Sequence, residues 1–172
     1  MTRYRPPGPK KSPYITREGH DILLKEQKQI WLRRREVVAA VSVAAAEGDR
    51  SENAEYIYRK KELREIDRRI RYLQKRLPDL IVVDKCPSNL EQVFFGAILN
   101  LETEDDETVR YRIVGPDEFD RADHYISMDS PLAQALLKKS LGDEVKVTLP
   151  VGQVTYLISS IGYDEAVTNS AA

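Results

Sequence analysis

The chain has 172 residues, of which 41% are apolar and 32% are charged, a size that allows one domain or two small ones. Its single cysteine, Cys86, excludes an internal disulfide and fits a reducing compartment. The sequence shows no apolar signal region and no run of about 18 apolar residues. We therefore expect a cytoplasmic protein without a membrane partner.

The net charge of −1 hides an uneven distribution of charged residues along the chain. Residues 59–77 carry nine basic and three acidic groups, whereas residues 78–172 carry seven basic and seventeen acidic groups. A basic segment joined to an acidic body predicts two different contact surfaces.

Residues 1–13 contain four prolines and four basic residues, a composition typical of a disordered tail. Contact of this basic tail with nucleic acid or with an acidic surface is a second interpretation, which composition supports only weakly.

Residues 14–78 contain two helical patterns separated by a short polar segment at 48–55. The first pattern follows a candidate N-cap, Thr16, and shows an apolar pair every seven residues until Gly48. These pairs are Leu23/Leu24, Ile30/Trp31, Val37/Val38 and Ala44/Ala45. We expect Trp31 to lie in the resulting seam, as part of the core.

The second helical pattern is more regular and ends before Pro78. Its apolar residues are three or four positions apart: Leu63, Ile66, Ile70, Leu73 and Leu77. Residues 14–78 are therefore predicted to form an antiparallel coiled-coil hairpin with its tip at 48–55. Two ordinary helices of a compact bundle are the alternative, but the high charge and the lack of further long helical patterns argue against it.

After a linker at 79–92, the apolar period changes from helical spacing to two. Residues 93–163 are predicted to fold as an α+β domain with a small antiparallel sheet and one short helix. Ser130 and Pro131 have the residue types of a helix N-cap and first helical position. Residues 164–172 are predicted to be a disordered tail. The expected strands span residues 93–101, 109–113, 124–128, 144–149 and 153–161, and the expected helix spans residues 132–139.

The spacing Asp49-x-x-Glu52 in the tip has two interpretations. Asp49 is a candidate N-cap with Glu52 as its capping-box partner, and Ser51 is an alternative cap. In the second interpretation, the two carboxylates supply oxygen ligands to Mg²⁺. Because two carboxylates do not complete such a site, the tip would complete one provided by another molecule.

Basic residues gather on the helix that leads away from the tip. A solvated coiled-coil face is the simplest explanation, but the excess of positive charge also predicts contact with nucleic-acid phosphates. The basic residues nearest the tip are Arg59, Lys60, Lys61 and Arg64. We find no phosphate-binding glycine loop, nucleophile motif or paired-histidine metal helix, so the sequence does not support catalysis by this chain alone.

Several stretches match one known family: ITREGHDILLKEQ, GDRSENAEYIYRKKELREIDRRIRYL, VFFGAILNLE, YRIVGPDEFD, YISMDSPLAQALLKKSLGDEV and the final hairpin. Through these stretches, the sequence resembles the bacterial Gre transcript-cleavage factors over roughly residues 14–163. The tip with the second helix is the most specific part of the match, and the basic run after the tip favours the B-type factors over the A-type. The proline-rich basic tail departs from the family pattern.

This resemblance implies a coiled-coil hairpin followed by a domain like the FK506-binding proteins. It implies RNA polymerase as the partner of a monomeric factor, with the hairpin inserted into the polymerase's secondary channel. Asp49 and Glu52 would help to hold a Mg²⁺ ion shared with the polymerase active site, which cleaves backtracked RNA. The factor is then not an enzyme itself and has no tightly bound cofactor.

The resemblance also implies two contact surfaces besides the tip. The basic residues from Arg59 to Arg64 would contact the 3′ end of the backtracked RNA. Asp129, Ser130 and Pro131 match the surface with which the family docks at the channel entrance.

Two other functions are open at this point. A regulator that enters the channel and inhibits polymerase without cleavage shares most of these features, although the intact acid pair argues against it. A prolyl isomerase with a coiled-coil appendage is also compatible with the fold class. However, a proline pocket needs converging aromatic side chains, and strand alternation would place Phe94 and Phe95 on opposite faces.

Overall fold

The computed structural model describes residues 10–46, 48, 52–149 and 152–164. The chain forms two compact units, one of residues 20–80 and one of the residues that precede and follow this segment. None of the helices in the described ranges has the length and apolar character of a membrane span.

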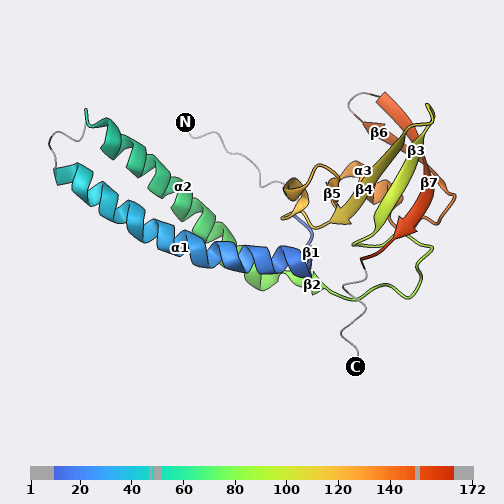
Figure 1. Ribbon diagram of the computed structural model, residues 1–172, viewed down its shortest axis with the longest axis horizontal. Coiled ribbons are helices and arrows are strands. Elements are labelled where there is room, and N and C mark those ends of the chain that lie inside the picture. The colour runs from blue at the N-terminus through green and yellow to red at the C-terminus, as the bar shows by residue number, and fades with distance from the viewer. Residues whose placement is uncertain (1–9, 47, 49–51, 150–151, 165–172) are drawn as a thin grey trace. The chain divides into compact units, whose positions relative to one another are not determined.

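The unit of residues 20–80 is built from two long helices. α1 (Arg17–Ala46) and α2 (Ala54–Arg76) lie side by side in opposite directions, and the short 3-10 helix η1 (Leu77–Asp79) follows α2 (Figure 1). Thr16 caps α1 as predicted, because its hydroxyl accepts a hydrogen bond from the Gly19 N–H at 3.0 Å. The two antiparallel helices α1 and α2 confirm the predicted helical hairpin.

The seam between α1 and α2 uses one member of each apolar pair. The buried residues Val37, Ile66 and Ile70 form its centre, against which Ile30, Val41 and Leu63 pack. The prediction that Trp31 is part of the core is wrong, since its side chain is 40% exposed. Adjacent helical residues point about 100° apart, so only one member of each pair can face the partner helix. The Trp31 ring lies 5.9 Å from the guanidinium carbon of Arg34.

The second unit contains a five-stranded sheet with the strand order β5-β4-β3-β7-β6 (Figure 1). Its strands are β3 (Ile98–Thr103), β4 (Thr108–Val114), β5 (Tyr125–Ser127), β6 (Glu144–Leu149) and β7 (Gly152–Gly162). Neighbouring strands are antiparallel except β4 and β5, which are parallel. The sheet is therefore mixed, and the prediction of a purely antiparallel sheet is wrong in this one pair. Helix α3 (Pro131–Leu136) contributes Leu132, Ala133 and Leu136 to the same hydrophobic core as the buried residues of the sheet. The predicted α+β class is confirmed.

Two predicted boundaries differ from the structure by three residues or more. The strand expected at 93–101 begins only at Ile98, because Gly96 has a φ of +86° and the Ala97 N–H donates to the Phe94 carbonyl in a turn. The helix expected at 132–139 ends at Leu136, because Leu137 has a ψ of 135° and Lys138 has a φ of +68°. A residue with positive φ continues neither a strand nor a right-handed helix.

A two-stranded parallel sheet joins β1 (Tyr14–Thr16) to β2 (Ile81–Val83). Beside it lies Glu118, which is 1% exposed and precedes the short 3-10 helix η2 (Phe119–Arg121). Its Oε1 accepts the N–H groups of Thr16 and Gly115, both at 2.9 Å, and its Oε2 accepts the Thr16 hydroxyl at 2.6 Å. The segment before α1 is therefore anchored to the sheet unit by a buried carboxylate.

Candidate functional site

The tip of the helical hairpin carries the first predicted site. Glu52 is exposed and lies two residues before the start of α2, whereas Asp49 lies outside the described residues. Glu52 forms neither a hydrogen bond nor an ion pair with any described residue. Its carboxylate therefore faces solvent near the end of the hairpin.

Asn53 is the N-cap of α2, and the prediction that Asp49 or Ser51 has this role is wrong. The Asn53 side-chain oxygen accepts the Tyr56 N–H at 3.1 Å. Its amide nitrogen donates to the Ala44 carbonyl at 2.9 Å and so connects the two helices across the tip. Asparagine is among the best N-cap residues, and its position directly before Ala54 and Glu55 is the sequence signal that was missed. The Glu52 side chain is thus not needed for capping.

Replacing Asn53 with alanine is expected to destabilise the hairpin by about 1–2 kcal/mol, because the cap and the bond across the tip are both lost. Thermal unfolding followed by far-UV circular dichroism measures this loss. Asn53→Asp keeps the capping oxygen and removes only the amide donor, so we expect it to retain most of the stability. Equal unfolding temperatures for wild type and Asn53→Ala would contradict the assignment.

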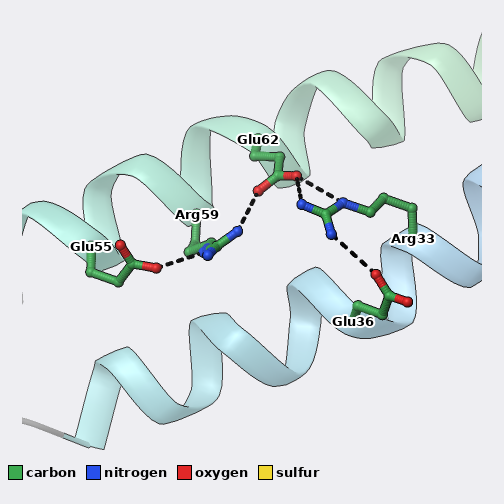
Figure 2. A network of polar contacts seen from close by, with 5 residues as sticks. All are labelled: Arg33, Glu36, Glu55, Arg59 and Glu62. Atoms are coloured by element: carbon green, nitrogen blue, oxygen red, sulfur yellow. Dashed lines mark hydrogen bonds and ion pairs between the residues drawn. The ribbon is translucent and has the colours of Figure 1, made fainter.

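A network of ion pairs fixes α2 against α1 behind the tip (Figure 2). Arg59 donates to Glu55 at 2.7 Å and to Glu62 at 3.1 Å, and Arg33 of α1 donates to the other oxygen of Glu62 at 2.6 Å. Glu36 also accepts from Arg33, at 3.1 Å. Glu62 is the hub, since both of its oxygens are used and its partners come from both helices.

Two further ion pairs connect the helices farther from the tip. Arg34 donates to Asp67 at 2.7 Å, and Arg69 donates to Glu26 at 2.6 and 2.8 Å. Arg34 and Glu26 lie on α1, whereas Asp67 and Arg69 lie on α2. Exposed ion pairs contribute little stability individually, but charged partners at fixed positions specify one register between the helices. These two ion pairs therefore help to set the register of α1 against α2.

The hub carboxylate gives the hairpin a defined dependence on pH. The hydrogen bond from Arg33 is the main cause that holds the pKa of Glu62 below its ordinary value of 4.5, with a smaller contribution from Arg59. A lowered pKa in the folded state adds stability above pH 4.5, and this stability is lost as the pH falls through the folded pKa.

We therefore expect Glu62→Gln to unfold at a lower temperature than wild type at pH 7, and this difference in unfolding temperature to be smaller at pH 3. Melting curves of both proteins at the two pH values provide the measurement. Because the two proteins share every other carboxylate, the difference between their unfolding temperatures reports on Glu62. A difference that stays constant between pH 7 and pH 3 would show that the charge on Glu62 does not support the hairpin.

The predicted RNA-contacting residues do not all share one environment. Arg59 is engaged by Glu55 and Glu62, and the Lys60 ammonium lies 5.1 Å from the centre of the Tyr56 ring. Lys61 and Arg64 are exposed, and no described carboxylate pairs with either of them. The structure thus separates Arg59, which supports the hairpin, from the other three residues.

Spacing places a longer basic stripe on the face of α2 opposite the seam. Residues three or four positions apart share one face of a helix, and the members of this face are all exposed. The basic stripe consists of Lys60, Lys61, Arg64, Arg68, Arg71 and Lys75. A continuous positive face of this length attracts a phosphate backbone.

The second predicted site, residues 129–131, lies at the start of α3. Ser130 caps α3 as predicted, with its hydroxyl oxygen accepting the Ala133 N–H at 3.2 Å, and Pro131 occupies the first turn. Asp129 is exposed, and its own N–H donates to the Ser127 hydroxyl oxygen at 3.2 Å. The structure therefore brings these three residues together in one short turn on the surface.

Comparison with known proteins identifies the family of the chain. Residues 13–82 match the family described as "Transcription elongation factor, N-terminal", and residues 87–163 match "Transcription elongation factor, GreA/GreB, C-term". The chain is 56% identical over 165 residues to transcription elongation factor GreB of Xanthomonas axonopodis pv. citri (strain 306), covering 95% of this chain and 98% of the relative. It is 53% identical over 167 residues to GreB of Pseudomonas aeruginosa, covering 96% and 99%.

Among solved structures, GreA factor homolog 1 (Gfh1) of Thermus thermophilus is 22% identical, with a TM-score of 0.41 over 88% of this chain and 99% of that chain. A superposition at this level adds nothing to the assignment. The sequence matches are sufficient, since they cover both units and nearly the full length of the curated relatives. The resemblance noted from the sequence is confirmed, and the chain belongs to the GreA/GreB family of transcription elongation factors.

Proposed function

We propose that the chain binds RNA polymerase, inserts its hairpin tip into the secondary channel and stimulates the polymerase's own cleavage of backtracked RNA. This activity would rescue arrested complexes in the cytoplasm. Membership of a family of transcription elongation factors supports RNA polymerase as the partner. The observation that carries the cleavage step is Glu52, an exposed carboxylate at the end of the hairpin that is not used as a helix cap.

The tip acids suit a Mg²⁺ ion that is shared with another molecule. Carboxylate oxygens are preferred ligands of this hard cation, and Mg²⁺ usually takes only one or two of them, with waters and phosphates at the remaining positions. No group of three or more His, Cys, Asp or Glu in the described part of the chain is placed to hold a metal. In this proposal, Asp49 and Glu52 would supply two ligands of an ion whose other ligands come from the polymerase and the RNA. Bound there, Mg²⁺ would stabilise the attacking and leaving oxygens of the cleaved phosphodiester.

The other residues of the hairpin position the tip and the RNA. Asn53 fixes the start of α2 directly after Glu52, and the network around Glu62 fixes α2 against α1. In the basic stripe, Lys60, Lys61 and Arg64 lie nearest the tip and would contact the phosphates of the extruded RNA 3′ end. Arg59 would contact RNA only by exchanging a carboxylate partner for a phosphate.

Docking of the sheet unit completes the proposal. The chain would bind the polymerase as a monomer. The turn of Asp129, Ser130 and Pro131 would contact the polymerase at the channel entrance. It presents an exposed carboxylate on a capped helix start. Such a surface suits a hydrogen-bond-donating or basic side chain on the partner.

Cleavage of RNA in stalled, backtracked polymerase complexes tests the proposed function. We expect short 3′ RNA fragments when the chain and Mg²⁺ are both present, far fewer when either is omitted, and none from RNA incubated with the chain and Mg²⁺ alone. The competing function, inhibition without cleavage, predicts slower nucleotide addition and no fragments. The proposal is falsified if the chain binds the complexes and produces only this second result.

A further inference from the structure

Ser12 belongs to the described part of the N-terminal basic tail, and it contacts the predicted docking turn of residues 129–131. The Ser12 N–H donates to Oδ2 of Asp129 at 2.9 Å, and the Ser12 hydroxyl donates to Oδ1 of the same carboxylate. One residue earlier, the Lys11 ammonium lies 3.6 Å from Oδ1 of Asp117, whose side chain is 4% exposed. All four residues belong to the sheet unit.

These contacts hold the Asp129 carboxylate in one orientation. Both of its oxygens accept a hydrogen bond from Ser12, and its backbone N–H is bound to Ser127. Asp129 is nevertheless exposed. Each carboxylate oxygen has two acceptor sites, so a further donor can still bind. Because serine is neutral, its hydrogen bonds do not offset the negative charge of the Asp129 carboxylate.

The next contacts along the segment keep Ser12 in place. The Pro13 carbonyl accepts the Ile81 N–H at 2.9 Å, and Thr16 binds the buried Glu118. The position of Ser12 beside Asp129 is thus set by contacts on both sides of it, with Lys11 on one side and β1 on the other.

We propose that Ser12 is a positioning residue for Asp129, and that residues 11–13 are part of the surface with which this factor docks on RNA polymerase. The inference rests on the proposed function. On the polymerase, the oriented Asp129 carboxylate is bound by a basic or hydrogen-bond-donating side chain. A side chain ordered before binding loses less conformational entropy when the complex forms, so orientation by Ser12 strengthens docking.

Replacing Ser12 with alanine tests this role, because it removes the hydroxyl donor and keeps the backbone. We expect the factor concentration for half-maximal RNA cleavage to rise roughly 2- to 5-fold, within the range for ordering one side chain, with an unchanged rate at saturation. Binding to polymerase without backtracked RNA should weaken by the same factor. Ser12→Thr keeps the hydroxyl and should restore wild-type values. Ser88→Ala, an exposed serine of the same unit, is the matched control.

A double-mutant cycle with Asp129→Ala separates positioning from a general effect. If Ser12 acts through Asp129, Ser12→Ala has no additional effect in the Asp129→Ala protein. Additive effects, unchanged binding, or tighter binding by Ser12→Ala would each overturn the inference. Failure of the proposed function would look different, because the wild-type chain would then produce no RNA fragments while the binding titrations still reported on Ser12.

Discussion

Alanine in place of Asp49 or Glu52 is expected to slow stimulated RNA cleavage by about 100-fold or more, the scale of losing one preorganised group at a reacting centre. In the proposed function, each substitution would remove a carboxylate ligand of the shared Mg²⁺. Glu52 belongs neither to the described seam nor to the described ion pairs between α1 and α2. Binding to polymerase should therefore persist. The measurement is the rate of RNA fragment release from stalled complexes at saturating factor, together with a competition titration for binding.

Glu55→Ala is the matched control for this loss. Glu55 is an exposed carboxylate three residues from Glu52, and it pairs with Arg59 at 2.7 Å. Because an exposed ion pair contributes little, we expect its cleavage rate to stay within about 3-fold of wild type. A loss as large as that of Glu52→Ala would show that negative charge near the tip matters generally. Parallel loss of binding in the tip variants would mean that these acids hold the complex together rather than supply ligands.

Glu118→Ala is expected to destabilise the sheet unit by about 3 kcal/mol or more, since it leaves three buried donors without their acceptor. These donors are the N–H and hydroxyl of Thr16 and the N–H of Gly115. Urea unfolding measures the loss, and hydrogen exchange of the Thr16 and Gly115 amides localises it. Both amides should exchange faster than in wild type.

Gly19→Ala tests the same anchor by adding atoms instead of removing them. A Cβ on Gly19 would lie 1.9 Å from Oε2 of Glu118, so the buried carboxylate would have to move. We expect a loss of stability comparable to that of Glu118→Ala. Asp120→Ala, at an exposed position in the adjacent η2, should change the free energy of unfolding by less than about 0.5 kcal/mol. An equally small effect of Glu118→Ala would show that the carboxylate is not an anchor.

The sequence predicted what depends on local repetition. Spacings of three and four residues located the seam residues Ile66 and Ile70, and alternation located β4 between Thr108 and Val114. Capping residues were predicted where one candidate stood alone, as at Thr16 and Ser130. Local sequence patterns identify an element without information about the elements that pack against it, and for this reason these predictions were confirmed.

What the sequence could not predict depends on partners far apart in the chain. β1 and β2 have three residues each, too few to show alternation, and they pair across the whole hairpin. Glu118 carries no signal of burial, because its donor Thr16 lies 102 positions earlier. The cap at Asn53 was missed for another reason, since Asp49 and Ser51 offered equally good side chains nearby. Adjacent apolar residues left open which of them faces the seam, and Trp31 was wrongly placed there.

The pairing of β1 with β2 makes the hairpin an insertion within a discontinuous domain. The chain leaves the sheet unit after Gly19 and returns to it at Ile81, so the two strands that flank the insertion are held side by side as a parallel pair. The N-terminal strand is synthesised first, yet its partner strand follows only after both helices. The contacts within the hairpin are closer in sequence, so we expect them to form first and β1 to dock late. Because β1 and β2 pair with each other within the sheet unit, we expect a change of hairpin length by whole heptads to leave the fold of that unit unaltered.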